Sequence, residues 1–345
     1  MKINKVKECF ILFMSALSCV SFSSCGNQDA LESKEYNYKE VKNPVHVIAN
    51  DPWVVRRDDN FYYCTADDGI NVRRIENLDD LKLKGASRVW SPPKDTLYSK
   101  EIWAPELHYI KGEWYIYFAA CDGLNEHHRM YVLKGTTQNP MDPFEYIGKV
   151  MDDSDHWGID GTIMEYHDEL YMIWSGWEGE VDKGQQLYIA HMDSPTSIDS
   201  ERICISVPDQ EWEMNGMEIE EGPTALVDKE QDTAIIVFSA SGSWTDDYCM
   251  GQLTLTGKDP MKADSWTKSD KPIFTKKDGA YGPGHCSFVT AYDDSLWMIY
   301  HCNRLSGTGW GGRSAWIQPV EWDGEKLNLG EPQTPEKTIL LPEKE

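Results

Sequence analysis

The sequence lacks the features of helical, nucleic-acid-binding and metal-rich proteins. No segment sustains a 3.6-residue hydrophobic period, so we expect no long helix. Positive charge is scarce, with 33 Lys and Arg against 58 Asp and Glu and a formal net charge of −25. This balance argues against nucleic acid or anionic polymers as tightly held partners and favours a neutral ligand. None of the nine cysteines forms a CxxC or other metal-type spacing.

Long hydrophobic runs are also absent, except for one near the N-terminus. Three lysines, Lys2, Lys5 and Lys7, precede an apolar stretch over residues 9–22 that is too short to span a membrane comfortably. Ser23-Ser24-Cys25 follows and resembles a bacterial lipoprotein cleavage site. We expect residues 1–24 to be a signal peptide and the mature chain to begin at a lipidated Cys25. Cys19 is the rival position, and an ordinary cleaved signal is the alternative.

The predicted mature chain is an exported protein whose membrane attachment is the lipid at Cys25, in the periplasm or on the cell surface; the alternative is a secreted protein. Residues 1–24 contain three Lys and one Glu, so their removal takes the net charge from −25 to −27. Residues 25–43 are polar and are predicted to form a tether. Residues 44–345 suffice for one large catalytic domain, which we expect to be monomeric.

Six cysteines follow Cys25, an even number that permits disulfides in an exported protein. They are Cys64, Cys121, Cys204, Cys249, Cys286 and Cys302. Most lie in or beside apolar strands of a chain whose core is large enough to do without cross-links. We therefore predict buried free thiols.

One pattern recurs five times: a polar residue beside Pro or Gly, a short apolar run, a polar turn, and an aromatic-rich strand. The openings are DP (51–52), PE (105–106), DG (160–161), EGP (221–223) and GPGH (282–285). The aromatic-rich strands are FYYC (61–64), WYIYF (114–118), LYMIW (170–174), AIIVF (234–238) and LWMIY (296–300). A fixed repeat of β-hairpins indicates a radial array, so we predict an all-β, five-bladed β-propeller.

The fifth repeat shows no fourth strand after Val320, whereas residues 46–48 precede the first repeat with no other place to go. We therefore expect one terminus to complete the blade begun by the other, which would close the ring and remove its exposed edges.

Three repeat openings carry a carboxylate, at Asp51, Asp160 and Glu221. The innermost strand of each blade begins at the axial face, so these acids should converge in one pocket. The tryptophans that flank the openings are Trp53, Trp103 and Trp157. Sugar hydrolysis needs one carboxylic acid to protonate the leaving oxygen, one carboxylate to activate water, and flat rings that stack on sugar faces. The pattern favours a glycosidase.

With these residues in place, the chain resembles glycoside hydrolase family 43 over nearly all of residues 44–335. The motifs that carry the resemblance are ANDPW (49–53), IWAPELHY (102–109), GIDGT (158–162), EEGP (220–223) and YGPGHCSF (281–288). The resemblance implies a five-bladed propeller and inverting chemistry without a required cofactor. It makes Asp51 the general base, Glu221 the general acid, and Asp160 the acid that orients Glu221 and adjusts its pKa. Glu220 is the competitor of Glu221, but adjacent strand residues point to opposite sides and the Glu-Gly-Pro match selects Glu221.

The resemblance assigns weaker roles to further residues. Glu106 is either a sugar contact or a structural hydrogen-bond partner, and Arg313 is either a pocket arginine or a solvated loop residue. His285 should lie near the propeller axis, where it could hold a structural Ca²⁺. We expect tryptophans to bind substrate, namely Trp53, Trp103 and Trp177, and Trp244 and Trp310 could line the mouth of the pocket.

Three histidines invite a metal-site interpretation. They are His127, His128 and His156. No Cys or carboxylate stands at helical or loop spacing to complete a tetrahedral set, so we predict ordinary loop histidines.

Within the family, the motifs most resemble those of the α-L-arabinofuranosidase members. The sequence thus predicts an inverting enzyme that removes terminal α-L-arabinofuranosyl residues from plant cell-wall glycans. A β-xylosidase or an endo-arabinanase with the same acids stays open, as does a propeller that only binds glycan. Three mutually repelling carboxylates argue against the last alternative, since binding alone does not need them.

Overall fold

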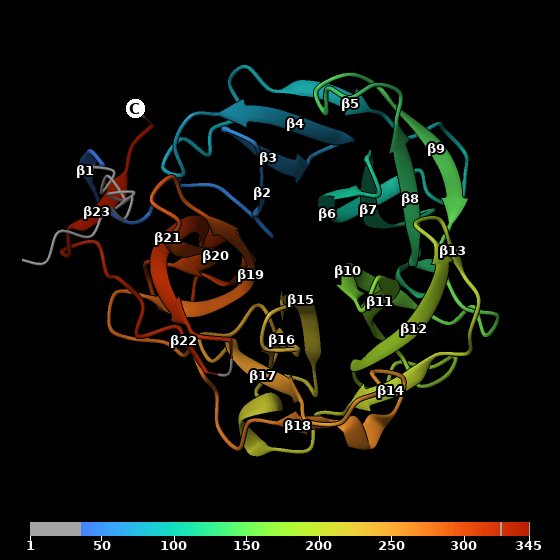
Figure 1. The fold of residues 1–345 in the computed structure, drawn as a ribbon. Helices are drawn as coiled ribbons and strands as arrows, with labels where there is room; N and C mark the ends of the chain where they lie inside the picture. Colours follow the sequence, from blue (N-terminus) through green and yellow to red (C-terminus); the bar gives the residue numbers. More distant parts are fainter. Residues whose placement is uncertain (1–35, 325, 345) are drawn as a thin grey trace, which may run out of the picture. The chain divides into compact units, whose positions relative to one another are not determined.

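Five antiparallel β-sheets are arranged around a central axis in the computed structural model, which describes residues 36–324 and 326–344 (Figure 1). Four sheets have four strands, and the third has five. Within each sheet the strands follow sequence order from the axis outward, except that the last two strands of the third sheet both pair with its third strand. The chain thus completes one blade before starting the next. The predicted five-bladed β-propeller is confirmed.

Each blade begins with its innermost strand. Blade 1 contains β2 (Trp53–Arg57), β3 (Asn60–Ala66), β4 (Ile70–Ile75) and β5 (Ser87–Trp90); blade 2 contains β6 (Lys100–Ile110), β7 (Glu113–Cys121), β8 (Arg129–Gly135) and β9 (Phe144–Lys149). Blade 3 contains β10 (Gly158–Tyr166), β11 (Glu169–Gly176), β12 (Gln186–Ser194), β13 (Ser197–Ile198) and β14 (Ile203–Ser206). Blade 4 contains β15 (Glu220–Asp228), β16 (Thr233–Ala240), β17 (Cys249–Leu255) and β18 (Trp266–Lys268); blade 5 contains β19 (Tyr281–Thr290), β20 (Leu296–Asn303), β21 (Arg313–Trp322) and β22 (Leu327–Asn328).

Helical structure in the described ranges is limited to four short 3₁₀ turns, at η1 (Asn125–His127), η2 (Glu211–Glu213), η3 (Ala263–Ser265) and η4 (Gly309–Gly312). Within residues 36–324 and 326–344, no helix has the length and apolar character needed to cross a membrane. The proposed signal peptide and Cys25 lie outside the described residues.

The hydrophobic core lies between neighbouring blades rather than at one centre. Each cluster combines side chains from two adjacent sheets, as where Tyr117 and Trp174 join the cluster between blades 2 and 3. A second strand is covered on both faces by the neighbouring blades, so it is apolar at nearly every position instead of alternating. β7 illustrates this, since every residue after Glu113 is buried. This double burial is why the aromatic-rich repeats could be placed from sequence.

The two ends of the described chain meet at blade 5. Ala315 in β21 exchanges backbone hydrogen bonds with His46 (2.8 Å from Ala315 N–H to the His46 carbonyl), and β1 (Tyr38–Val41) pairs with β23 (Ile339–Pro342). Residues 46–48 were expected to pair with the last blade, and His46 forms an isolated bridge with it. It was wrong that blade 5 has no fourth strand of its own, because β22 pairs with the end of β21 through two residues.

The predicted tether, residues 25–43, extends too far. Residues 38–41 form β1, and Val41 is buried in the cluster between blades 1 and 5. Asn43 is buried as well, and its side chain donates a hydrogen bond to the carbonyl of Ile317. These residues therefore belong to the folded unit that starts at Tyr36.

The six cysteines after Cys25 are all free, as predicted. Five are buried and Cys204 is half-buried. The blades therefore hold together through apolar packing and strand hydrogen bonds without covalent links between these thiols.

Candidate active site

The innermost strands share a local distortion at the end where the site lies. Each blade has at least one residue of positive φ near the start of this strand; these include Asp51 (46°), Ala104 (42°), Asp160 (55°), Gly222 (53°) and His285 (46°). The pairing register shifts at the same positions in β6, β10, β15 and β19. Such bulges redirect side chains. They turn the residues at the blade starts toward the axis.

Gly222 shows how closely these strands approach one another. A Cβ atom at this position would lie 3.0 Å from Nδ1 of His285, in addition to the strain of a positive φ. The EEGP motif therefore needs glycine next to Glu221 both for the bulge and for the space that His285 occupies.

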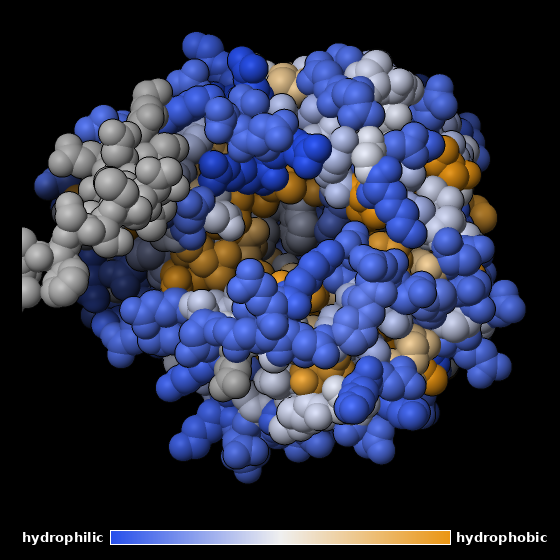
Figure 2. Space-filling view, in the orientation of Figure 1, coloured by the Kyte–Doolittle hydropathy of each residue, from blue (hydrophilic) through white to orange (hydrophobic). Residues whose placement is uncertain are grey.

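A pocket of about 480 Å³ lies among the blade starts and is lined by Asp51, Asp160, Glu221, His285 and Arg313. Its volume is within the range of small-molecule sites. In the orientation of Figure 1, the space-filling view shows a hollow at the centre of the ring with hydrophobic residues on its walls (Figure 2). The three acids that the sequence picked out thus share one cavity.

Asp51 is surrounded by side-chain nitrogen atoms from blade 5. Its Oδ1 lies 3.3 Å from Nδ1 of His285, 3.3 Å from Nδ1 of His301 and 3.4 Å from Nη1 of Arg313. Burial opposes ionisation of the carboxyl, but these groups outweigh it and hold the pKa of Asp51 well below its ordinary range. Burial also lowers the pKa of His285, and that of His301 to about 3, so both rings are neutral near pH 7. The permanent charge that favours ionised Asp51 is therefore Arg313.

Glu221 has the opposite electrostatic character. Burial raises its pKa to about 7, and the negative charge of Asp51 acts in the same direction. Tyr248 donates a hydrogen bond of 2.8 Å to Oε1 of Glu221, which limits the rise. One pocket thus holds a carboxyl that ionises readily and another that retains its proton near neutral pH, the division of labour that acid–base hydrolysis requires.

Asp160, at the start of blade 3, contacts the EEGP motif at the start of blade 4. Its Oδ2 accepts a hydrogen bond of 3.1 Å from the backbone N–H of Gly222 and lies 3.8 Å from Nδ1 of His285. Burial and the charges of Glu221 and Asp51 raise the pKa of Asp160 well above its ordinary value. Because the charge of Glu221 acts on Asp160, the two acids do not titrate independently.

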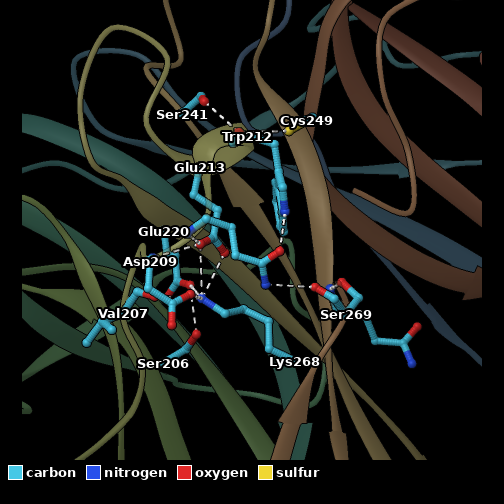
Figure 3. A network of polar contacts seen from close by, with 12 residues as sticks. Ser206, Val207, Asp209, Trp212, Glu213, Glu220, Ser241, Cys249, Lys268 and Ser269 are labelled. Carbon is cyan, nitrogen blue, oxygen red and sulfur yellow. Dashed lines mark hydrogen bonds and ion pairs between the residues drawn. The ribbon is translucent and has the colours of Figure 1, made fainter. Parts of the chain in front are cut away.

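Glu220 points away from the pocket. This agrees with the prediction that Glu221, and not its neighbour Glu220, is the residue that faces the site. Its Oε1 accepts hydrogen bonds from Oγ of Ser206 (2.7 Å) and Nζ of Lys268 (3.0 Å). Nζ of Lys268 also lies 3.0 Å from Glu213, so a buried ion network joins the outer parts of blades 3 and 4 (Figure 3). Burial raises the pKa of Glu220 to about 8, yet the residue serves packing between blades.

Four tryptophans form the walls of the pocket: Trp103, Trp157, Trp244 and Trp310. Trp177 does not line it. Its ring stacks behind Trp157, with 4.8 Å between ring centroids and 8° between planes. The expectation of direct sugar contact by Trp177 therefore does not fit its position; Trp177 supports the Trp157 wall.

Two other predicted contacts also lie outside the pocket lining. Trp53 packs on His108 and donates a hydrogen bond from Nε1 to the carbonyl of Leu107 (2.9 Å), which ties blade 1 to blade 2. Glu106 is buried with its Oε2 2.8 Å from Nε2 of His108. Of the two roles left open for Glu106, the structural one fits this environment, because the side chain is satisfied away from the cavity.

His285 lies at the axis, as expected, but with a different set of neighbours from a Ca²⁺ site. Ca²⁺ takes six to eight oxygen ligands. Nδ1 of His285 instead faces Asp51 and Asp160. Within the described part of the chain, the side chains spaced to hold a metal ion form a different group, without His285. The side chains around His285 do not form such an oxygen cage, and its contacts suit a positioning role between two carboxylates.

Tyr248 and His301 were missed by the sequence analysis. Tyr248 is buried beside Glu221, and its ring stacks on that of His301 with 5.6 Å between centroids. His301 directly follows the LWMIY strand, so its polarity at the end of an apolar run was the available signal. Tyr248 directly precedes β17, at the strand end nearest the pocket, but one among 17 tyrosines offers no such signal.

The sequence matches the description "Glycosyl hydrolases family 43" over residues 41–326. The chain belongs to this family. This family-43 chain is 30% identical over 340 residues to an extracellular exo-α-(1→5)-L-arabinofuranosidase of Streptomyces avermitilis, covering 94% of this chain and 69% of the relative. A protein of the same name from Streptomyces chartreusis is 32% identical over 273 residues, covering 76% of this chain and 82% of the relative.

Solved structures give a concordant result. An α-L-arabinofuranosidase from Lactobacillus brevis superimposes with a TM-score of 0.78 at 29% identity, covering 86% of this family-43 chain and 98% of that chain. The family membership makes the protein a glycoside hydrolase, and the pocket among the blade starts is its candidate active site.

Proposed function

We propose that this enzyme removes terminal α-L-arabinofuranosyl residues from plant cell-wall polysaccharides or their oligosaccharides, with inversion at the anomeric carbon. The observation that carries the mechanism is the electrostatic contrast between Asp51, held ionised, and Glu221, held protonated, in one pocket. The substrate is suggested by the relatives named as arabinofuranosidases.

In the proposed reaction, Glu221 donates its proton to the glycosidic oxygen as the bond to the anomeric carbon breaks. Asp51 takes a proton from a water molecule, whose oxygen attacks that carbon from the opposite face. Asp160 holds the strand that carries Glu221 by accepting a hydrogen bond from the Gly222 N–H, and we propose that it also adjusts the pKa of Glu221. No cofactor enters these steps.

The walls of the pocket suit a neutral sugar. Trp103 and Trp157 on one side and Trp244 and Trp310 on the other offer flat apolar faces. A β-xylosidase or an endo-arabinanase would use the same acids, so the substrate has to be tested directly.

The test is parallel incubation with nitrophenyl α-L-arabinofuranoside, nitrophenyl β-xyloside and linear arabinan. We expect release of nitrophenol from the arabinofuranoside and of single arabinose units from arabinan, with proton NMR showing the inverted anomer in the first minutes. Faster hydrolysis of the xyloside, or release of oligosaccharides from arabinan, would replace arabinofuranosidase by one of the alternatives. A retained anomer would overturn the mechanism.

We also propose that the enzyme is exported, in line with relatives that are named extracellular, and acts as a lipid-anchored monomer attached through Cys25. Cys25→Ala should move activity from the membrane fraction to the soluble exported fraction of expressing bacteria. An unchanged distribution would favour an ordinary cleaved signal or the rival Cys19. Light scattering of the mature domain would test the monomer.

A further inference from the structure

A second cluster of chemically capable side chains lies in blade 2, behind one wall of the pocket. Glu101, Cys121 and His128 bring Oε2, Sγ and a ring nitrogen within 4.8 Å of one another. The sequence analysis found no Cys or carboxylate at loop spacing from His128. Sequence spacing does not reveal this group, because strand pairing brings its members together. Lys100 pairs with Cys121, which places the neighbouring Glu101 beside the end of β7.

The Nε2 atom of the His128 ring has a lone pair that can bind a ligand. Its Nδ1 lies 3.0 Å from the carbonyl of Asn125 and must carry the proton for that hydrogen bond, which leaves a lone pair on Nε2. His128 is fully buried, and Nε2 has no hydrogen-bond partner of standard geometry among the described residues. A buried polar atom without a partner is costly, so this nitrogen calls for a ligand. A backbone carbonyl on the other ring nitrogen is the usual arrangement of a metal-bound histidine.

We propose that Glu101, Cys121 and His128 bind a zinc ion, with water in the fourth position. Thiolate, imidazole and carboxylate are the ligands that Zn²⁺ takes in proteins. Donor atoms around a tetrahedral zinc with bonds of about 2.0–2.3 Å lie roughly 3.3–3.6 Å apart. Oε2 of Glu101 lies 3.8 Å from Nε2 of His128 and 2.9 Å from Sγ of Cys121, so small side-chain movements suffice.

Binding would replace the proton on Cys121. The thiol now donates a hydrogen bond to Glu101, and burial raises its pKa to about 12. Coordination would form the sulfur–zinc bond while the thiol proton passes to solvent, so zinc affinity should rise with pH. The partly exposed Glu101, with 42% of its side chain accessible, provides the route of entry.

The site is linked to the active-site wall without touching the catalytic acids. The ring of Trp103 stacks on that of His128 with centroids 3.9 Å apart and 22° between planes. Asn125, whose carbonyl holds His128, also accepts a hydrogen bond of 2.8 Å from Nε1 of Trp157. A bound zinc would fix the orientation of His128 and thereby the two tryptophans Trp103 and Trp157. The ion would be structural and would take no part in hydrolysis.

The test uses the mature protein, stripped with a chelator, reloaded with zinc and freed of excess metal. Zinc content is measured, and Co²⁺ replaces zinc to report thiolate coordination by its charge-transfer absorption. The variants are Cys121→Ser and Glu101→Gln. The second changes an exposed side chain and should not disturb folding. Cys64→Ser is the matched control, because Cys64 is also fully buried on the second strand of a blade.

We expect about one zinc per chain and the cobalt–thiolate band in wild type and in Cys64→Ser. Cys121→Ser should lose the band, and both ligand variants should bind zinc at least ~100-fold more weakly, since even second-shell changes cost 10–100-fold. Wild-type protein that binds no zinc, or shows no cobalt–thiolate band, would overturn the proposal. So would equal affinity in wild type and Glu101→Gln. None of these readouts depends on which glycoside is cleaved.

Discussion

Replacing Glu221 by Gln should make the folded protein more stable at alkaline pH while disabling the general acid. In the folded state the pKa of Glu221 is raised from 4.5 to about 7, chiefly by burial. Below pH 4.5 the carboxyl is protonated in both states and adds no penalty. Between pH 4.5 and 7 the unfolded chain ionises while the folded chain does not, so wild-type stability falls. Above pH 7 the penalty is complete.

The size of this penalty follows from the two pKa values. A rise from 4.5 to about 7 costs the folded state roughly 3 kcal/mol at alkaline pH. Glutamine removes it and can still accept the hydrogen bond from Tyr248. For a domain of this size, 1 kcal/mol shifts Tm by about 2 °C. The Tm of the variant relative to wild type should therefore increase by roughly 6 °C between pH 4.5 and pH 8.

Thermal unfolding followed by circular dichroism at several pH values provides the assay. Glu145→Gln, at an exposed position in β9, is the control for the substitution itself and should differ from wild type by a constant amount. If the Glu221→Gln curve also runs parallel to wild type from pH 4.5 to 8, then burial does not hold the proton on Glu221 and the reasoning fails.

The remaining predictions concern catalysis. Asp51→Asn should retain the fold and lower turnover by ~10³-fold or more, because the water loses its base; activity within tenfold of wild type would remove Asp51 from this role. Glu221→Gln should hurt nitrophenyl substrates least, since nitrophenol leaves without protonation, and equal losses on natural glycosides would count against Glu221 as the acid. Asp160→Asn should move the alkaline limb of kcat/KM to lower pH, because removing the coupled carboxyl lets Glu221 ionise earlier. An unmoved limb with normal activity would reduce Asp160 to a structural residue.

The sequence could predict the ring because its strongest signals arise from double burial. Stretches such as WYIYF are apolar at every position, since blades cover both faces, and their spacing gives the number of blades. β22 and β13 were not predicted, because two-residue strands at the outer edge bury little and carry no pattern. β1 was assigned to a tether for a similar reason: YKEV is mostly polar, and its partner lies some 300 residues away in β23.

Within the site, too, residues with a local sequence signal were predicted, and residues whose position depends on distant partners were not. Asp51, Asp160 and Glu221 stand beside Gly or Pro at the blade starts, so local sequence marked them. Trp53 and Trp177 looked equivalent to Trp103 and Trp157 as tryptophans near blade starts. Their actual partners, the Leu107 carbonyl for Trp53 and the Trp157 ring for Trp177, lie in distant parts of the sequence and leave no local signal. The group around His128 could not be found by spacing, because its members come from both strands of a hairpin and the loop that follows.

The side chains that surround the catalytic base come from the first and the last blade. Asp51 stands at the start of blade 1, and its contact with His301 in blade 5 spans 250 positions of the chain. During synthesis, the base therefore emerges long before Arg313, whose charge favours its ionisation, and before the two histidines that lie beside it. A chain that stops short of blade 5 has all three acids but an open ring and an unsupported Asp51. Activity is therefore expected only once blade 5 has closed against blade 1.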